Sequence, residues 1–199
     1  MPSSMIHLLA ARTFSPREDP LFWVGSVCPD TVEDRCAKDA SHFRDRPDRE
    51  NALRELEART HRGNSLEEGI LLHLFLDWKW DAQAYDLYRK QHGQEDGWFA
   101  AYRYQIAMAG SYLYRTNPWG EAVWTAMLQA PYAGQVSACS AAEIRAFLTR
   151  NFTWLQENDT GASPFFTPSF VEKFVTHSVE EYRHWRKPET AADAEERNS

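Results

Sequence analysis

The chain carries a histidine and an aspartate four residues apart inside an apolar run. His73 and Asp77 lie in Ile-Leu-Leu-His-Leu-Phe-Leu-Asp-Trp, residues 70–78. On a helix, residues four apart share a face, with about 5–6 Å between their Cβ atoms. A carboxylate buried among such neighbours is costly unless a hydrogen-bonding partner or a metal ion compensates its charge. The pair therefore predicts either a buried polar network or a site for a first-row divalent cation.

Other imidazole and carboxylate groups along the chain could complete such a site. The candidate metal ligands are His7, Asp30, His42, His73, Asp77, His177 and Glu181. No cysteine is needed in this set. Mixed nitrogen and oxygen ligation is typical of catalytic zinc, manganese or iron rather than of a structural, cysteine-rich zinc site. We therefore expect Zn²⁺ as the cofactor, with Mn²⁺ or Fe²⁺ as alternatives.

Four of these candidates also have ordinary roles that need no metal. His7 could be a hydrogen-bonded core residue, and Asp30, which follows Pro29, could be a turn or N-cap residue. His177 and Glu181 again share a helical face, and such a pair is often merely solvated. Because aromatic residues lie on the same face, we expect His177 near the core side of its helix.

Capping and helix-breaking signals indicate which elements carry these residues. Glycine and proline breaks, a Ser140–Glu143 capping box and the Thr167-Pro168 pair delimit the helices. The predicted helices are 4–14, 48–61, 65–91, 95–115, 118–130, 140–157 and 168–187. Residues 15–30 are expected to form a loop, and 31–46 a loop with a short helix. With no strand alternation or repeat, we predict a single all-α domain of about seven helices around a buried metal cleft, spanning 1–187, and a disordered tail over 188–199.

Composition limits the classes of function. The 199 residues are 43% hydrophobic and 14% aromatic, which indicates a folded domain with its own core. The net charge of −7 argues against binding to nucleic acid. No apolar run has the roughly 18–20 residues that a transmembrane helix needs. Three cysteines without a CxxC pair, and the lack of a signal peptide, indicate a cytoplasmic protein with reduced thiols.

The order of these motifs resembles the zinc-dependent phospholipase C family, which is related to the single-strand-specific zinc nucleases. The pieces that match are His7 in the first helix, Gly25-Ser-Val-Cys-Pro-Asp30, Ser41-His42-Phe43, Gly69-Ile-Leu-Leu-His-Leu-Phe-Leu-Asp77 and His177-Ser-Val-Glu-Glu181. The resemblance covers about the first 80 residues and, more loosely, the last helix.

The resemblance implies an all-helical fold with up to three zinc ions in a cleft. Matched by position, Asp30, His42, His73 and Asp77 would form one metal site, His7 would serve a second ion beside Asp77, and His177 and Glu181 would supply a third. The family also uses a mature N-terminal Trp and a further His soon after the His-x-x-x-Asp pair, and this chain has neither. We therefore expect one or two ions.

The leading hypothesis is a metal-dependent phosphoric ester hydrolase in which metal-activated water attacks phosphorus. Asp30, on a loop, is the candidate base that orients this water. The substrate would be a small-molecule or lipid phosphoester, and the abundant aromatic residues could line an apolar cleft for it. One alternative is a cytoplasmic phosphohydrolase of nucleotides or small phosphate esters. Another is a non-catalytic helical protein that binds a metal or a partner. The oligomeric state is left open.

Overall fold

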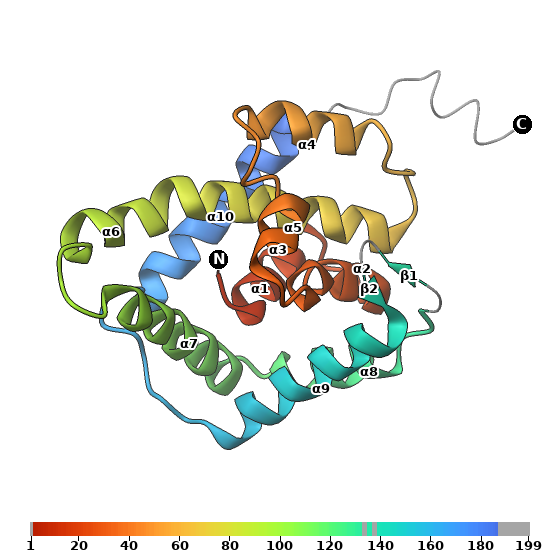
Figure 1. Cartoon of the computed structure of the whole chain (residues 1–199). Coiled ribbons are helices and arrows are strands. Elements are labelled where there is room, and N and C mark those ends of the chain that lie inside the picture. Colours follow the sequence, from red (N-terminus) through yellow and green to blue (C-terminus); the bar gives the residue numbers. More distant parts are fainter. Residues whose placement is uncertain (1, 133–134, 137–138, 187–199) are drawn as a thin grey trace, which may run out of the picture.

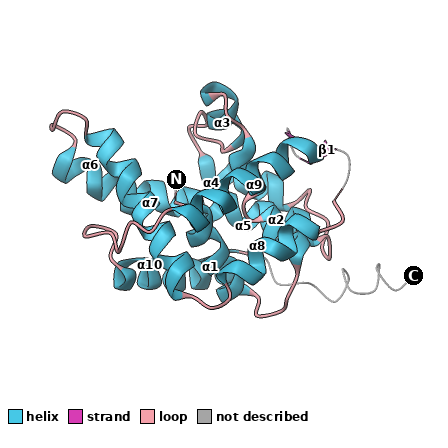
Figure 2. Ribbon diagram, turned by 90° about the horizontal axis from the view of Figure 1, so that it is seen from below, coloured by secondary structure: helices cyan, strands magenta, loops and turns pink. Residues whose placement is uncertain are grey.

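The computed structural model describes residues 2–132, 135–136 and 139–186. Its helices are α1 (Ser4–Phe14), α2 (Pro20–Gly25), α3 (Arg35–Ser41), α4 (Arg49–Glu57), α5 (Ser65–Trp80), α6 (Asp86–His92), α7 (Trp98–Thr116), α8 (Gly120–Gln129), α9 (Ala141–Glu157) and α10 (Pro168–Trp185). A 3₁₀ turn, Cys28–Thr31, follows α2, and a π-helical turn, Asp81–Tyr85, joins α5 to α6. The fold is all-α and forms a single helical domain, as predicted (Figure 2).

The seven predicted helices correspond to α1, α4, the continuous α5–α6 unit, α7, α8, α9 and α10. Local chemistry sets their starts. Asn64 accepts a hydrogen bond from the backbone N–H of Glu67, and Ser140 and Glu143 form the expected capping box. Thr167 caps α10 in the same way. The predicted tail, 188–199, lies outside the described residues.

One prediction of irregular structure is wrong. Residues 15–30, expected as a loop, contain α2 and the 3₁₀ turn. The start of α2 has the same signal as α10, an N-cap followed by proline: Asp19 accepts from the N–H of Phe22, and Pro20 is the first helical residue. The chain also has a small antiparallel hairpin of β1 (Gln135–Val136) and β2 (Cys139–Ser140). Strands of two residues are too short to show alternation in a sequence.

The helices are arranged around α1 and α2. Figure 1 shows the α5–α6 unit on one side of these two helices and α7, α8 and α9 on the other. In agreement, α1 contacts α5, α7 and α10, and α2 contacts α5 and α8. The middle of α5 is buried almost all round, from Leu71 to Asp77. None of the helices in the described part of the chain combines the length and apolar character that crossing a membrane requires.

A close crossing of α2 and α5 fixes the centre of the fold. Two glycines make it possible, because a Cβ atom at Gly25 would lie 2.1 Å from the carbonyl oxygen of Leu66, and one at Gly69 2.3 Å from that of Phe22. These neighbours are backbone atoms of packed helices, so they cannot move aside as a flexible side chain would. The two backbones therefore lie in direct contact.

We expect Gly69→Ala to lower the free energy of unfolding by about 1–3 kcal/mol, measured by denaturant titration. The helix propensity of alanine alone would stabilise α5 by up to about 1 kcal/mol, so a net loss reports the clash with α2. Ala101→Ser, which adds one atom at an exposed position of α7, should change stability by less than about 0.5 kcal/mol. A Gly69→Ala variant as stable as the parent would contradict the close crossing.

Candidate metal centre

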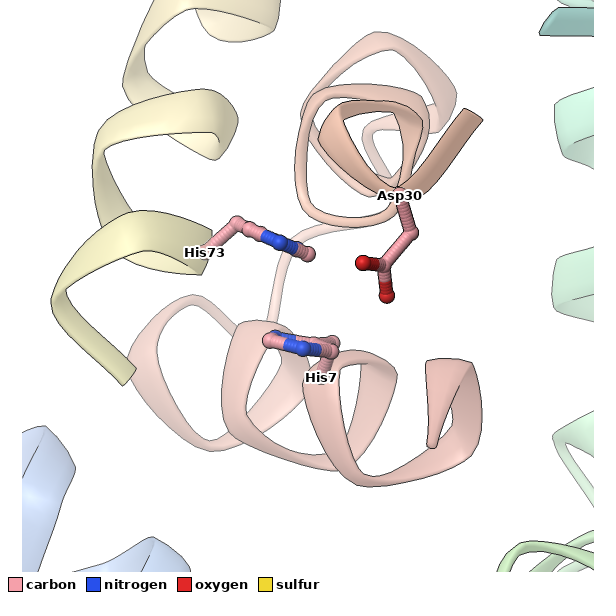
Figure 3. A group of neighbouring side chains, drawn as sticks. All are labelled: His7, Asp30 and His73. Carbon is pink, nitrogen blue, oxygen red and sulfur yellow. The ribbon is translucent and has the colours of Figure 1, made fainter. Parts of the chain in front are cut away.

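Five of the seven predicted ligands converge on one place in the protein interior. They come from four elements: His7 from α1, Asp30 from the 3₁₀ turn, His42 from the C-terminal end of α3, and His73 and Asp77 from α5. Figure 3 shows the side chains of His7, Asp30 and His73 pointing toward a common space. Asp30 has a side-chain exposure of only 9%, and the four remaining ligands are fully buried.

The donor atoms of these residues lie close together. The Nε2 atoms of His42 and His73 are 3.2 Å apart, and His42 Nε2 lies 3.6 Å from Asp30 Oδ1 and 3.7 Å from Asp77 Oδ2. His7 Nε2 lies 3.3 Å from Asp77 Oδ1. Two overlapping sets, His7–Asp30–His73 and His42–His73–Asp77, have donor atoms within 4.8 Å of one another. His73 belongs to both sets and is the centre of the cluster.

Backbone carbonyl groups fix the orientation of two of the imidazoles. His73 Nδ1 donates to the carbonyl oxygen of Ser26 at 2.9 Å, and His42 Nδ1 donates to that of Lys38 at 2.8 Å. Since a carbonyl oxygen can only accept, both Nδ1 atoms carry hydrogen, and both Nε2 atoms face the cluster. Histidines that bind a metal are held in the same way, by a hydrogen bond from the nitrogen that does not bind.

The contact between the two Nε2 atoms needs either a proton or a cation. Burial and the neighbouring His7 lower the pKa of His73 to about 3, so near neutral pH its Nε2 presents a lone pair. The contact is then satisfied either by a proton on His42 or by a cation bound to both rings. Two nitrogen ligands of a tetrahedral zinc ion, each at about 2.0–2.1 Å, lie roughly 3.3 Å apart. The observed 3.2 Å fits that arrangement.

Both carboxylates of the cluster are ionised. Burial by itself raises the pKa of Asp77, but the adjacent imidazoles of His7 and His73 hold this pKa well below its ordinary value. Burial also raises the pKa of Asp30, and the adjacent imidazoles and the Lys38 ammonium lower it below the ordinary value. The cluster thus offers neutral nitrogen and anionic oxygen donors together, which is the ligand chemistry of zinc, manganese or iron.

Several polar atoms of the cluster have no hydrogen-bond partner among the described residues. They are Nδ1 and Nε2 of His7, Oδ1 of Asp77, and Oδ1 of Asp30, which has only an ion-pair contact with Lys38. A buried polar atom that lacks a partner destabilises a fold by about 1–3 kcal/mol. Of these atoms, Nε2 of His7 and Oδ1 of Asp77 lie 3.3 Å apart, so a divalent ion beside them would satisfy two groups that the protein leaves unpaired. The residues present therefore fit a metal ion.

The structure does not bring His177 and Glu181 into the cluster. They form a loose pair on α10, 3.7 Å apart, with side-chain exposures of 62% and 33%. The expectation that His177 lies on the core side of its helix is wrong. The inward stripe of α10 runs through Phe174, Ser178 and Tyr182, and His177 lies beside that stripe, facing outward.

Sequence reasoning missed two cationic residues at the cluster. Lys38 Nζ lies 3.0 Å from Asp30 Oδ1 and donates to the Asp30 carbonyl oxygen at 3.2 Å. Arg44 Nη2 donates to Asp77 Oδ2 at 2.9 Å. Lys38 precedes His42 by one helical turn, which could have drawn attention to it. Nothing in the sequence pairs Arg44 with Asp77, because that contact depends on tertiary packing.

A cleft of about 1220 Å³ opens beside the cluster. Asp30, Lys38, Arg44 and Asp81 line one part of it. Further side chains come from α7 and α9, mostly apolar: Phe99, Tyr102, Ile106, Phe147, Trp154 and Leu155. Asp30 is the one residue of the cluster that lines this cavity, which is charged near Asp30 and largely apolar along α7 and α9.

Comparisons with protein-family models, with curated proteins and with solved structures find no match to this chain. The resemblance to the phospholipase C family thus rests on the motif residues themselves. Assignment of this site depends on its own geometry.

We expect the purified wild-type protein to bind zinc stoichiometrically after metal-replete expression, as measured by elemental analysis. His73→Ala should lose this metal, because His73 belongs to both ligand sets. Asp77→Asn should weaken binding, because the variant lacks the anionic oxygen. His177→Ala is the matched control and should keep the metal, since His177 lies outside the cluster. A His73→Ala protein with full metal content would contradict the assignment.

Proposed function

We propose that the protein is a metal-dependent phosphoric ester hydrolase. The observation that carries this proposal is the convergence of five buried imidazole and carboxylate ligands, two of them oriented by backbone carbonyls, beside a cleft. A purely structural polar network would not need access from such a cavity. The motif resemblance to the zinc-dependent phospholipase C family points to the same class of reaction.

His42, His73 and Asp77 would hold one divalent ion, with Asp30 near the same position. His7, beside the second oxygen of Asp77, would serve a further ion. Bound there, Zn²⁺, or else Mn²⁺ or Fe²⁺, would polarise a phosphoryl oxygen and lower the pKa of a water molecule toward neutrality. One or two ions fit this set of ligands, because His177 and Glu181 lie elsewhere on the fold.

The residues of the chain have distinct tasks in such a reaction. Asp30 lines the cleft and is ionised, so it is the candidate base that would orient the attacking water. The carbonyl groups of Ser26 and Lys38 would hold His73 and His42 so that their Nε2 atoms face the ion. The packed imidazoles, with His7 and His73 stacked at a centroid distance of 3.9 Å, exclude water from the rear of the site.

The cleft favours a small-molecule or lipid phosphoester as substrate. Phe99 and Trp154, with exposures of 48% and 38%, offer apolar contacts to the part of a substrate other than its phosphoryl group. The net charge of −7 disfavours nucleic acid. The three cysteines form no disulfide within the described residues, in keeping with a reducing compartment such as the cytoplasm.

The experiment that tests this function is a hydrolysis assay over three substrate classes: lysophospholipids, nucleotides and aryl phosphates. We expect turnover of at least one class. A chelator should abolish it and added Zn²⁺ or Mn²⁺ should restore it, because the ion supplies the Lewis acid. His73→Ala should be inactive, whereas His177→Ala should retain the parental rate.

Two outcomes would contradict the proposal. Turnover that survives the His73→Ala substitution would mean that the cluster is not the active site. A protein that binds metal stoichiometrically and hydrolyses none of the three classes would favour a non-catalytic metal-binding role.

A further inference from the structure

Each carboxylate of the cluster is paired with a cationic side chain. Lys38 Nζ lies 3.0 Å from Asp30, and Arg44 Nη2 lies 2.9 Å from Asp77. The surrounding charges are paired as well: Asp81 with Arg44 and Arg49, and Asp39 with Arg35 and Arg44. Counting the pairs nearest the cluster, Lys38, Arg44 and Arg49 cancel the formal charges of Asp30, Asp77 and Asp81.

This balance has a consequence for metal binding. A divalent ion added to a neutral cluster leaves two positive charges that no acidic side chain of the cluster compensates. Excess charge in a buried place is unfavourable, because water cannot solvate it. The ion is therefore held best when an anion enters with it.

Lys38 and Arg44 are placed to receive that anion. Both line the cleft, and their side chains are 19% and 22% exposed, whereas Asp77 is fully buried behind them. Arg44 has a donor to spare, since its Nη1 lies 3.6 Å from Asp39, which is long for a hydrogen bond. The lysine ammonium has three donors; one donates to the backbone carbonyl oxygen of Asp30, and the contact with Asp30 Oδ1 is an ion pair. An oxyanion at this end of the cleft would meet both cations.

We propose that the metal ion and a dianionic phosphoryl group bind to this centre cooperatively, with Lys38 and Arg44 as the residues that couple them. The inference rests on the proposed function and names its substrate class: phosphate monoesters, rather than diesters. A monoester carries about −1.5 to −2 charges at pH 7, which matches the two charges that an ion adds. A diester carries a single charge and leaves part of the excess uncompensated.

Coupling of this kind is reciprocal, so it can be measured from the metal side without any turnover. The probes are Zn²⁺ at micromolar concentration, followed by competition with a chelating dye, and inorganic phosphate as the dianion. Dimethyl phosphate at equal ionic strength is the matched monoanion. We expect phosphate to lower the Kd for zinc by about tenfold, within the usual range of coupling between sites. Dimethyl phosphate should lower it by less than about threefold.

The variant Lys38→Met separates a coupling role from a structural one. It keeps the backbone carbonyl that orients His42 and leaves the charge of Asp30 uncompensated. We therefore expect tighter zinc binding than wild type when phosphate is absent, and little further gain when phosphate is added. Lys38→Arg should restore the coupling. Arg35→Met removes a charge from the same helix at a side chain that is 91% exposed, and it should leave the coupling unchanged.

The proposal is overturned if phosphate leaves the zinc affinity of the wild-type protein unchanged, a result that needs no variant to fold. It is also overturned if Lys38→Met weakens zinc binding equally with and without phosphate, as a purely structural lysine would. Hydrolysis of diesters without this coupling would leave the proposed function standing and reject only the monoester inference. Coupling without hydrolysis of any ester would reject the proposed function and leave the cooperative binding of metal and dianion standing.

Discussion

The ionised carboxylate of Asp77, fully buried in the most apolar stretch of α5, is the constraint that organises this protein. Its charge has to be compensated by groups brought from other elements. His7 of α1 lies at one oxygen, and Arg44, from the segment after α3, donates to the other. Without such partners, a buried carboxylate would destabilise the fold by several kcal/mol. The packing of α1 and of the segment after α3 against α5 is thus inseparable from the electrostatics of the site.

The close crossing of α2 and α5 sets the geometry of the imidazoles. Because Gly25 and Gly69 let the two backbones touch, the carbonyl oxygen of Ser26 comes within 2.9 Å of His73 Nδ1. The 3₁₀ turn that carries Asp30 follows α2 closely, so its position also depends on this crossing. A larger residue at either glycine would move the carbonyl that orients one ligand and the turn that supplies another.

The sequence predicted the structure best where the determining interactions are local. The apolar run around His73 and Asp77 indicated their burial, and caps such as Ser140 located helix starts. The sequence did not predict features that depend on tertiary packing. The short helix α2 has a clear Asp19-Pro20 start but too few residues for a helical period to emerge. Lys38 and Arg44 look like surface residues in the sequence, and only the tertiary structure pairs them with buried carboxylates.

The position of His177 argues against a third ion in the proposed metal centre. On α5, His73 and Asp77 face the ligand cluster, whereas Phe75 and Lys79 lie on the opposite side and line a pocket with His177 and Glu181. A helix is about 10 Å wide with its side chains, so α5 itself separates the two groups. On the side that faces the cleft, Lys38 and Arg44 supply the positive charge that a further ion would otherwise add. These fixed cations pair with the carboxylates, and an oxyanion that competed for them would make the occupancy of metal and anion interdependent, as proposed.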